Sequence, residues 1–342
     1  MRVAIFGYYG FGNLGDEAVL HAMVEHLREA LPGVELWVLS GDPAETERTH
    51  GVRGVPRTDL RAVRRLFRSS DLVCSGGGSL FQDVTSWRSP LFYGLLHELA
   101  RGTPVLVYAQ GIGPLRRRTS RAVTRRAMEG AAAITVRDQD SADRLRELGV
   151  ERPVEVVCDP ALGLSASASH PQDRTLVVSV RPWPGVSWSR LLEALRRAAR
   201  QAELQPRVVC LHRVADLSAS EELAVQLGSD LVVPSSPREA LEAVAGARVV
   251  VGMRLHALVL AAAAGVPFVG VAYDPKVSSF AAWVEMPCVA ANSVDPSELA
   301  GQVAALAADL GAPGRLRRKV DSLRPLARRP AQLAAGLVGV VC

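Results

Sequence analysis

Arg254 and His256 are the residues whose types and spacing most clearly suggest chemistry. They follow the apolar, β-branched run Val249–Val251, which predicts a buried strand, and residues 256–264, rich in Ala and Leu, predict a helix behind them. A guanidinium and an imidazole in a strand-to-helix turn, beside the unpaired N–H groups of a helix start, suit a small anion that also needs a proton. The alternative interpretation is that Arg254 is an exposed surface charge and His256 an ordinary residue at a helix start. The apolar residues around them make this alternative less favoured.

Other cationic side chains follow predicted strands in the second half of the chain. Arg181 comes after strand 176–180 and Lys276 after strand 268–271, while strand 207–211 is followed by His212 and Arg213. The carboxyl ends of parallel strands meet at one edge of a sheet, and ligands bind there. We therefore expect these residues to gather positive charge at one edge of a second domain.

The first half opens with a predicted strand at Val3–Phe6 and a helix at 18–30, joined by a glycine-rich loop. Its polar residues Asn13, Asp16 and Glu17 suit the hydroxyl groups of a sugar better than a phosphate, which the two carboxylates would repel. Asp16 is the candidate general base. Glu17 has two open interpretations, a contact to substrate or an interaction with the helix dipole.

The same loop contains Gly10-x-Gly12-x-x-Gly15, which matches the dinucleotide-binding fingerprint. A dinucleotide enzyme needs an acidic residue at the end of the second strand. Asp42 comes too late in the chain for that role, so an NAD-dependent oxidoreductase is a weaker alternative.

Three more polar or glycine-rich loops follow strands of the first half. The predicted strands are 71–74, 104–108 and 134–136, and the residues that follow them and are candidates for the acceptor or the cleft are Gly76, Gly77, Gly78, Gln110, Gly111 and Arg137. Consecutive glycines let another molecule approach the backbone closely. We expect these loops to converge at one edge of the first sheet.

Composition restricts the class of protein. The chain has 342 residues, 48% hydrophobic and 22% charged, with a net charge of +5, and only two of its 40 basic residues are lysines. Basic residues do not alternate with aromatic ones, which argues against nucleic-acid binding. Five cysteines without a CxxC pair indicate reduced core residues of a cytoplasmic protein, and no signal peptide or membrane-spanning segment is expected. No cluster of His, Cys and carboxylates has metal-ligand spacing, so we expect no metal and no cofactor.

Two arginine-rich helices are predicted in the first half, at 59–68 and 116–126. Such a run is usually a solvated helix face. It also suits peripheral contact with an anionic membrane at its inner surface.

Alternating strands and helices over this length predict an α/β protein with two doubly wound Rossmann-like domains, whose parallel sheets face a cleft as in the GT-B architecture. We place the domains at 1–164 and 175–310. The small, polar stretch 165–174 is the linker between them, and the helical segment 311–342 is expected to return to the first domain.

At this point the sequence resembles the polysaccharide pyruvyl transferase family, in particular the bacterial branch that modifies the cell-wall polymer anchoring S-layer proteins. The resemblance rests on the order of six stretches: Gly12–Glu17, Ser75–Gly78, Gln110–Pro114, Arg137-Asp138 with Ser141, Gly252–His256 and Tyr273–Lys276.

The resemblance implies transfer of pyruvate from phosphoenolpyruvate, as co-substrate, to two hydroxyls of one sugar, giving a cyclic ketal and phosphate. It assigns Arg254 and His256 to the donor site. From its chemistry, the His256 imidazole can supply the proton that the donor gains or protonate the leaving phosphate. Arg181, His212, Arg213 and Lys276 join them only by their positions after strands. The first domain would then hold the lipid-linked or polymeric sugar acceptor and the second the phosphoenolpyruvate.

Two alternatives besides the oxidoreductase stay open at this stage. A GT-B sugar-nucleotide glycosyltransferase shares the architecture and differs in its donor. A glycan- or anion-binding protein without catalysis would use the same residues without turnover.

Overall fold

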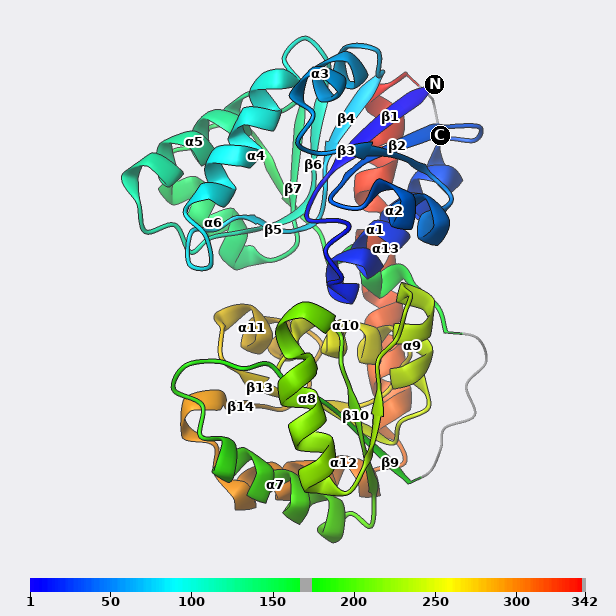
Figure 1. Ribbon diagram of the computed structural model, residues 1–342, viewed down its shortest axis with the longest axis vertical. Helices are drawn as coiled ribbons and strands as arrows, with labels where there is room; N and C mark the ends of the chain where they lie inside the picture. The colour runs from blue at the N-terminus through cyan, green and yellow to red at the C-terminus, as the bar shows by residue number, and fades with distance from the viewer. Residues whose placement is uncertain (167–173, 340–342) are drawn as a thin grey trace. The chain divides into compact units, whose positions relative to one another are not determined.

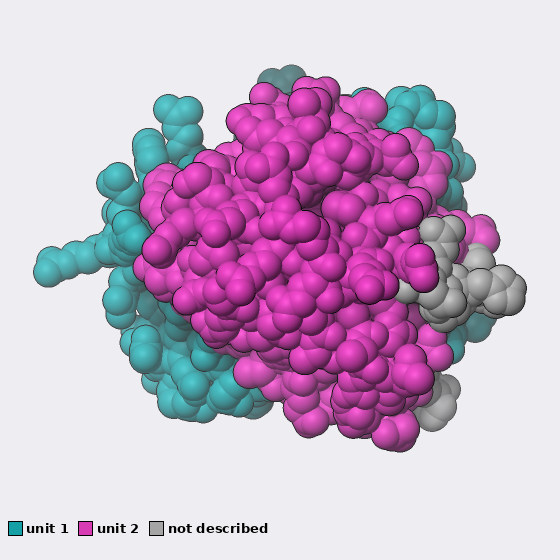
Figure 2. Space-filling view, turned by 90° about the horizontal axis from the view of Figure 1, so that it is seen from below, with its two compact units in different colours: residues 1–11, 19–163, 324–342 teal, residues 12–18, 164–323 magenta. Residues whose placement is uncertain are grey.

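The computed structural model describes residues 1–166 and 174–339. Contacts divide the chain into two compact units, which Figure 2 shows in different colours. Unit 1 comprises residues 1–11, 19–163 and 324–342, and unit 2 comprises residues 12–18 and 164–323. The short segment 12–18 thus groups with the second unit although its sequence neighbours belong to the first. Most of the predicted linker, residues 167–173, lies outside the described residues.

Unit 1 is built on an eight-stranded parallel sheet with the order β3-β2-β1-β4-β6-β7-β8, and β5 pairs with β6 (Figure 1). The strands are β1 (Arg2–Phe6), β2 (Glu35–Ser40), β3 (Arg53–Pro56), β4 (Leu72–Ser75), β5 (Gly78–Phe81), β6 (Val105–Ile112), β7 (Ala133–Val136) and β8 (Val154–Val156). The helices are α1 (Leu14–Ala30), α2 (Pro43–His50), α3 (Leu60–Arg68), α4 (Arg88–Leu99), α5 (Arg118–Glu129) and α6 (Gln139–Glu147).

Alternation along β1 shows how the sheet of unit 1 is covered. Ala4 and Phe6 point into a core cluster that α3, α4, α5 and α6 close with residues such as Phe67 and Leu145. Val3 and Ile5, which are also fully buried, point to the other face. Because both faces are buried, the strands are near-continuous apolar runs, as expected for a parallel sheet.

Unit 2 repeats this plan with a six-stranded parallel sheet of order β11-β10-β9-β12-β13-β14. The strands are β9 (Thr175–Ser179), β10 (Gln205–Val209), β11 (Asp230–Val232), β12 (Val249–Gly252), β13 (Phe268–Ala272) and β14 (Cys288–Ala290). The helices are α7 (Trp188–Gln201), α8 (Arg213–Leu227), α9 (Pro237–Ala245), α10 (Leu255–Ala263), α11 (Pro275–Trp283), α12 (Pro296–Ala308) and α13 (Ala312–Leu337), the last of which continues into unit 1. The prediction of two parallel α/β sheets is confirmed.

Several element boundaries differ from the sequence prediction. Helix α1 begins at Leu14, four residues early, because the Asn13 carbonyl accepts the Glu17 N–H and its side chain accepts the Gly15 N–H. Strand β6 continues through Gln110 to Ile112, past an irregularity at Ala109, whose φ of 47° absorbs the extra residue. Residues expected in loops therefore lie in a helix and a strand.

Six elements, α2, α8, α11, β3, β5 and β14, were not predicted at all. Helix α8 was not predicted because its apolar residues do not form one buried stripe. Val214 and Val225, for example, are both 82% exposed. Strand β5 begins at Gly78, inside the glycine run that suggested a loop.

Four cysteines lie in the described part of the chain, and none of these four forms a disulfide. Cys74, Cys158 and Cys210 are buried, as predicted for core residues, and Cys288 is partly exposed. Burial raises the pKa of the Cys74 and Cys158 thiols. Cys342 is outside the described residues.

Two buried histidines of unit 1 make its stability depend on pH. Burial lowers the pKa of both His26 and His97 from 6.5 to about 4. The His97 ring lies edge-on to Phe6 and Phe81, with its Nε2 3.2 Å from the Ser75 hydroxyl. The unfolded chain binds protons at these residues near pH 6.5, whereas the folded chain resists them until about pH 4, so stability falls as the pH drops through this range.

We therefore predict that acidification from pH 7.5 to pH 5 costs about 2 kcal/mol of unfolding free energy per buried histidine. His97→Phe keeps an aromatic ring in the core and removes the titrating group, so its melting temperature should fall less over this pH range than that of the wild type. Met128→Leu, in the same core cluster, is the control and should keep the wild-type pH slope. Equal slopes for His97→Phe and the wild type would contradict the assignment.

Candidate functional site

The strand order of unit 2 places a topological switch between β9 and β12. Neighbouring strands are connected in opposite directions on its two sides, since β9 leads to β10 and β12 leads to β13. The carboxyl ends of two such strands leave a crevice where open α/β sheets bind ligands. Arg181 follows β9 and Arg254 follows β12, so the two guanidiniums flank this position.

Arg254 is held by a carboxylate of its own unit. Its Nε and Nη2 donate to the two oxygens of Asp216, each at 2.6 Å. The Asp216 side chain is 1% exposed and that of Arg254 is 12% exposed. This two-pronged pair fixes the guanidinium plane and uses two of its three nitrogens, leaving Nη1 for a ligand.

His212 lies in the same electrostatic environment, at the N-cap of α8. Its Nδ1 accepts the Ala215 N–H at 3.4 Å, which leaves Nε2 to carry the proton of the neutral ring. Burial and the positive charges of Arg254 and Arg181 lower the pKa of His212, against the opposite effect of Asp216. The imidazole is therefore neutral at pH 7.

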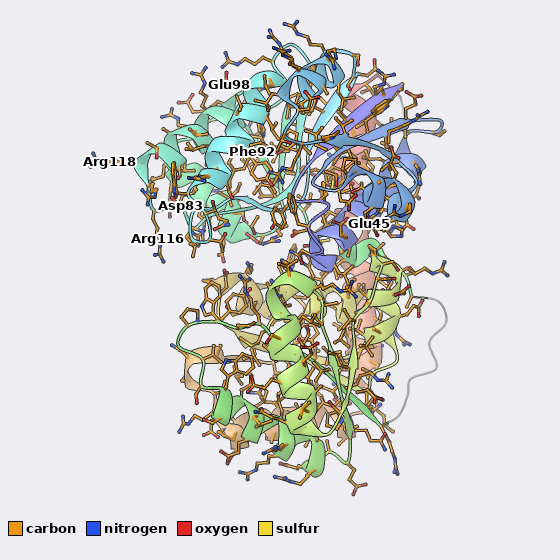
Figure 3. The ribbon with its side chains drawn as sticks, in the orientation of Figure 1. Glu45, Asp83, Phe92, Glu98, Arg116 and Arg118 are labelled. Carbon is orange, nitrogen blue, oxygen red and sulfur yellow. The ribbon has the colours of Figure 1, made fainter. Side chains whose placement is uncertain are left out.

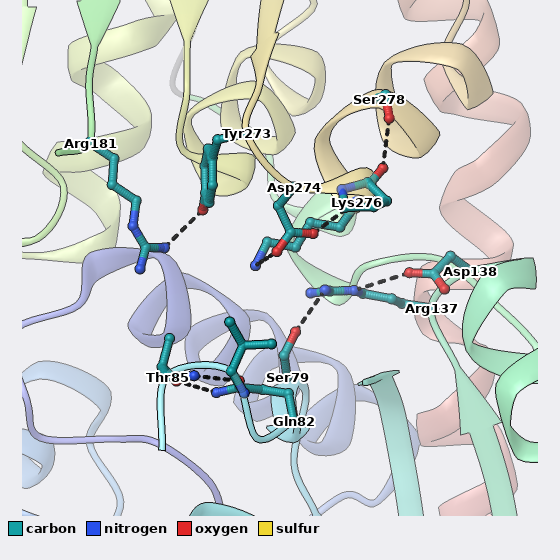
Figure 4. A network of polar contacts seen from close by, with 12 residues as sticks. Ser79, Gln82, Thr85, Arg137, Asp138, Arg181, Tyr273, Asp274, Lys276 and Ser278 are labelled. Atoms are coloured by element: carbon teal, nitrogen blue, oxygen red, sulfur yellow. Dashed lines mark hydrogen bonds and ion pairs between the residues drawn. The ribbon is translucent and has the colours of Figure 1, made fainter. Parts of the chain in front are cut away.

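Arg181 is held by aromatic rings. Its Nη1 donates to the Tyr273 hydroxyl at 2.8 Å (Figure 4). Its guanidinium carbon lies 4.8 Å from the Trp183 ring centre and 5.0 Å from that of Tyr273. In the described part of the chain no carboxylate pairs with Arg181. Its charge is thus ordered by cation–π contacts and available to an anion.

The positive charges of Lys276 and Arg213 are held less firmly by their neighbours. The Lys276 ammonium lies 3.4 Å from a carboxylate oxygen of Asp274, the residue that caps α11, and 5.9 Å from the Tyr273 ring centre (Figure 4). Arg213 is the exposed first residue of α8. Neither makes a contact as defined as that of Arg254.

The segment 12–18 also belongs to this part of unit 2. The Leu14 N–H donates to the Leu211 carbonyl at 2.9 Å, and Asn13 forms an antiparallel bridge with His212. The Asn13 amide donates to the Asp16 carboxylate, and Glu17 is buried in the same helical turn. Asn13, Asp16 and Glu17, predicted on the acceptor side, thus group with the cationic residues of unit 2.

The environment of Gly15 argues against the dinucleotide interpretation. The His256 ring lies against its α-carbon, where a methyl group would be 2.7 Å from Cγ of the imidazole. The loop after β1 is seven residues long, and the first turn of α1 carries two carboxylates. A pyrophosphate cradle needs a short turn and an uncharged helix start.

In unit 1 the glycine run after β4 is packed against the protein itself. A β-carbon on Gly76 would overlap the Tyr9 hydroxyl, and one on Gly77 would lie 2.5 Å from Val19 Cγ1. Gly78 has a φ of 97°. Internal packing explains these glycines, and their predicted contact with a substrate stays a prediction.

Gln110 is fully buried in β6, and its amide donates to the Gly76 carbonyl. The prediction that it lies in an open loop is wrong, because β6 extends past the bulge at Ala109. Gly111 lies in the same strand, where a methyl group would be 2.6 Å from Nη2 of Arg137. These two residues position their neighbours at the strand ends of unit 1.

Arg137 is also buried and contacts protein groups on several sides. Its Nη2 donates to the Ser79 hydroxyl at 2.9 Å and its Nε to Asp138 at 3.4 Å (Figure 4), and Nη1 lies 3.8 Å from Asp159. It therefore connects β5, β7 and the turn after β8 at the carboxyl edge of the sheet.

Within the described ranges no three or more His, Cys, Asp or Glu side chains group closely enough to hold a metal ion. The expectation that the protein needs no metal or cofactor stays a prediction. Among the same residues, no helix combines the length and apolar character that crossing a membrane requires.

Three contributors to this site were missed as site residues by the sequence analysis: Asp216, Trp183 and Tyr273. Asp216 lies four residues after His212, in a helix that was not predicted. Recognising α8 would have shown that this spacing puts both side chains on one helical face. The pairing of Trp183 with Tyr273 joins residues 90 positions apart, and only the fold brings them to a ring distance of 4.7 Å.

Removing one partner of the buried Asp216–Arg254 pair should strongly destabilise the protein. Asp216→Ala leaves a mostly buried guanidinium without its carboxylate, and we expect a loss of about 3–5 kcal/mol in unfolding free energy by urea denaturation. Arg329→Ala is the matched control, because both partners of its ion pair with Glu155 are about 40% exposed. It should change stability by less than about 1 kcal/mol. Similar losses of unfolding free energy in the two variants would show that burial does not make the Asp216 pair more important for stability than an exposed ion pair.

Solved structures with a similar fold cover nearly the whole chain. A co-structure of MnaA from S. aureus with UDP has a TM-score of 0.70 at 10% identity and covers 99% of this chain and 97% of its own. The UDP-GlcNAc 2-epimerase from Neisseria meningitidis bound to UDP-GlcNAc has a TM-score of 0.62 at 10% identity, with coverage of 98% and 99%. The lipopolysaccharide outer core galactosyltransferase WaaB in its apo form has a TM-score of 0.56 at 13% identity, again with coverage of 98% and 99%.

At these identities the likeness establishes the fold, which is GT-B-like. No curated protein matches the sequence. The model of the polysaccharide pyruvyl transferase family matches residues 13–275, which begin at the loop before α1 and end at the Asp274-Pro275 turn. The chain therefore belongs to the polysaccharide pyruvyl transferase family, a family of transferases.

Proposed function

We propose that this protein transfers pyruvate from phosphoenolpyruvate to two hydroxyls of one sugar, forming a cyclic ketal and releasing phosphate. The observation that carries the proposal is the set of cationic and imidazole groups at the switch point of unit 2, within the stretch that matches the family. An anionic donor that must gain a proton is the chemistry these groups suit.

Phosphoenolpyruvate offers a carboxylate and a phosphate, both of which arginine binds well. Arg181 is the first candidate for one of them, because its charge is ordered by two rings and not neutralised by a carboxylate in the described residues. Arg254 is the second, through the Nη1 that Asp216 leaves available. Lys276 and Arg213 would add positive charge nearby, and neutral His212 would donate a hydrogen bond through Nε2.

The reaction needs protons to move in both directions. The methylene carbon of the donor gains a proton, which leaves an oxocarbenium-like centre at C2, and a sugar hydroxyl adds to that centre. Phosphate then leaves, and the second hydroxyl closes the ketal ring. The two sugar hydroxyls lose two protons in total. This number equals the one proton that the methylene carbon gains plus the one that leaves with phosphate.

We assign His256 to the proton delivered to the donor and Asp16 to the proton received from the acceptor hydroxyl. His256 is the second residue of α10 and Asp16 lies in the first turn of α1, both among the residues of unit 2. Asn13 and Glu17 would bind acceptor hydroxyls. Contacts of the acceptor with Gly76, Gly77, Gly78 and Arg137 belong to the same proposal, whereas Gln110 and Gly111 support these loops from within the sheet.

The proposed acceptor is a lipid-linked or polymeric sugar of a cell-wall polymer, of the type that anchors S-layer proteins. Mass spectrometry of candidate lipid-linked disaccharides after incubation with phosphoenolpyruvate tests this proposal. The disaccharide that is the acceptor should gain the mass of pyruvic acid less one water, and it should do so with EDTA present. A product that carries a sugar from a UDP-sugar donor would instead support the alternative, a GT-B sugar-nucleotide glycosyltransferase, which shares the architecture and differs in its donor. Binding of phosphoenolpyruvate without product from any acceptor would support a binding protein.

Substitutions should separate donor binding from proton transfer. Arg181→Lys keeps the charge and loses the planar fork, so phosphoenolpyruvate binding should weaken by roughly 1.5–3 kcal/mol in calorimetry. His256→Gln should retain binding while kcat falls about 10²–10⁴-fold. Arg200→Lys, on the exposed surface of α7, should change neither. If His256→Gln turns over at the wild-type rate, another group moves the proton.

We also propose that unit 1 contacts an anionic membrane through the outer surfaces of α3, α4 and α5, which we call the basic face. Exposed arginines without ion pairs in the described residues are Arg61, Arg64, Arg65 and Arg68 on α3 and Arg118, Arg121 and Arg125 on α5. Figure 3 shows Arg118 projecting from the end of α5, whereas Glu98 on α4 pairs with Arg126.

Between the two arginine-rich helices, α4 exposes apolar side chains. It contacts both helices, and Leu95 on its outer surface is 40% exposed. Trp87, just before α4, is 47% exposed, with the guanidiniums of Arg88 and Arg117 within 6 Å of its ring centre. Tryptophan beside arginine is typical of surfaces at the level of lipid headgroups. Such contact would hold the protein at the inner face of the membrane, beside a lipid-linked acceptor.

Liposome flotation tests this proposal. Each arginine near an anionic surface contributes about 1 kcal/mol, so the wild type should float with anionic vesicles and not with neutral ones. Arg64→Glu/Arg68→Glu should lose much of this binding. Arg200→Glu/Arg318→Glu makes the same change in net charge on unit 2 and should float like the wild type. Equal recovery with neutral and anionic vesicles would refute the membrane contact.

A further inference from the structure

We propose that Gly15 is a positioning residue for His256: the absence of a side chain at position 15 lets the imidazole pack against the α1 backbone and fixes its orientation. The inference rests on the proposed function only in so far as His256 moves a proton. The packing itself is a property of unit 2 that can be tested without the reaction.

The contact between Gly15 and His256 is too close for any larger residue. A methyl group on Gly15 would overlap Nδ1 of the ring and lie 2.7 Å from Cγ and 2.9 Å from Cβ of His256. Ring rotation could relieve the first two contacts. The Cβ contact is fixed by the backbone of α10, so an added methyl group would displace the ring and the helix start together.

The segment that carries Gly15 is itself held in place by residues of unit 2. The Leu14 N–H donates to the Leu211 carbonyl at 2.9 Å, and Asn13 bridges to His212. Within the segment, the Asn13 side chain accepts the Gly15 N–H at 3.3 Å and donates to Asp16. These contacts hold the main chain at Gly15 in place, and the His256 imidazole packs against it.

The backbone of Gly15 does not by itself explain why glycine stands there. Gly15 is the second residue of α1 and lies outside the set of positive-φ glycines, which includes Gly10 and Gly12. Alanine is the better helix former at an ordinary helical φ, so the local backbone would favour it. The side chain of His256 is the structural feature that excludes it.

Gly15→Ala is the test variant, and Gly301→Ala is its matched control. Gly301 is also a helical glycine of unit 2, in α12, with open space where a β-carbon would go. In two-bond ¹H–¹⁵N spectra without substrate, Gly15→Ala should shift the His256 imidazole signals, identified by their loss in His256→Gln. Gly301→Ala should leave them unchanged.

Kinetics then connect the position of the ring to the reaction. We expect Gly15→Ala to lower kcat by about 10²-fold, the cost of displacing a catalytic group by roughly 1 Å, with KM for phosphoenolpyruvate nearly unchanged. In a His256→Gln background the same substitution should cause no further loss, because it acts through the imidazole. A full additional loss in the double variant would overturn the inference.

Two further results distinguish this inference from the proposed function. Shifted His256 signals with wild-type kcat would support the positioning and refute the role of His256 in proton transfer. Unshifted signals in a folded Gly15→Ala protein would overturn the positioning whatever the activity. If Gly15→Ala does not fold, Asn13→Ala, which removes the Asn13 side-chain contacts to Gly15 and Asp16, should broaden the same imidazole signals, and unchanged signals would overturn the inference.

Discussion

The constraint on which the rest of this structure depends is that every strand pair in both sheets is parallel. A parallel strand needs a crossover that returns to the starting edge, so all carboxyl ends in one sheet lie together. This places Arg181, His212 and Arg254 at one edge of unit 2, although 73 residues separate the first from the last. Helices on both faces bury the strands and leave this edge as the place where polar groups can collect.

Within that edge, most of the charged groups are held by protein partners. Asp216 fixes the plane of Arg254, and Trp183 and Tyr273 order Arg181. Arginine side chains have many rotamers, so ordering them before a ligand arrives removes an entropic cost from binding. The two arginines differ in charge balance: Arg254 is paired with a carboxylate, whereas Arg181 has its charge available. For this reason Arg181 is the stronger candidate for the proposed donor, although the family motif points to Arg254.

The glycines of both units show a second physical theme, which is close packing of the protein against its own backbone. Gly76 and Gly77 admit Tyr9 and Val19, Gly111 admits Arg137, and Gly15 admits His256. In sequence such glycines are indistinguishable from those that leave room for a phosphate. The distinction needs the position of a side chain that is distant in sequence, and in each of these cases the structure supplies it.

The sequence by itself determined the two parallel α/β sheets and the residues that follow their strands, because hydrophobic runs and glycine stops are local signals. It also determined the family, through six short stretches in a fixed order. It misjudged local boundaries where capping or a bulge extends an element, as at Leu14 and Gln110. Only the tertiary structure decided that Asp216 pairs with Arg254, that Tyr273 holds Arg181 and that the segment 12–18 packs on unit 2. Each of these contacts joins residues far apart in the chain, and side-chain packing in three dimensions, which no local pattern encodes, selects the partner.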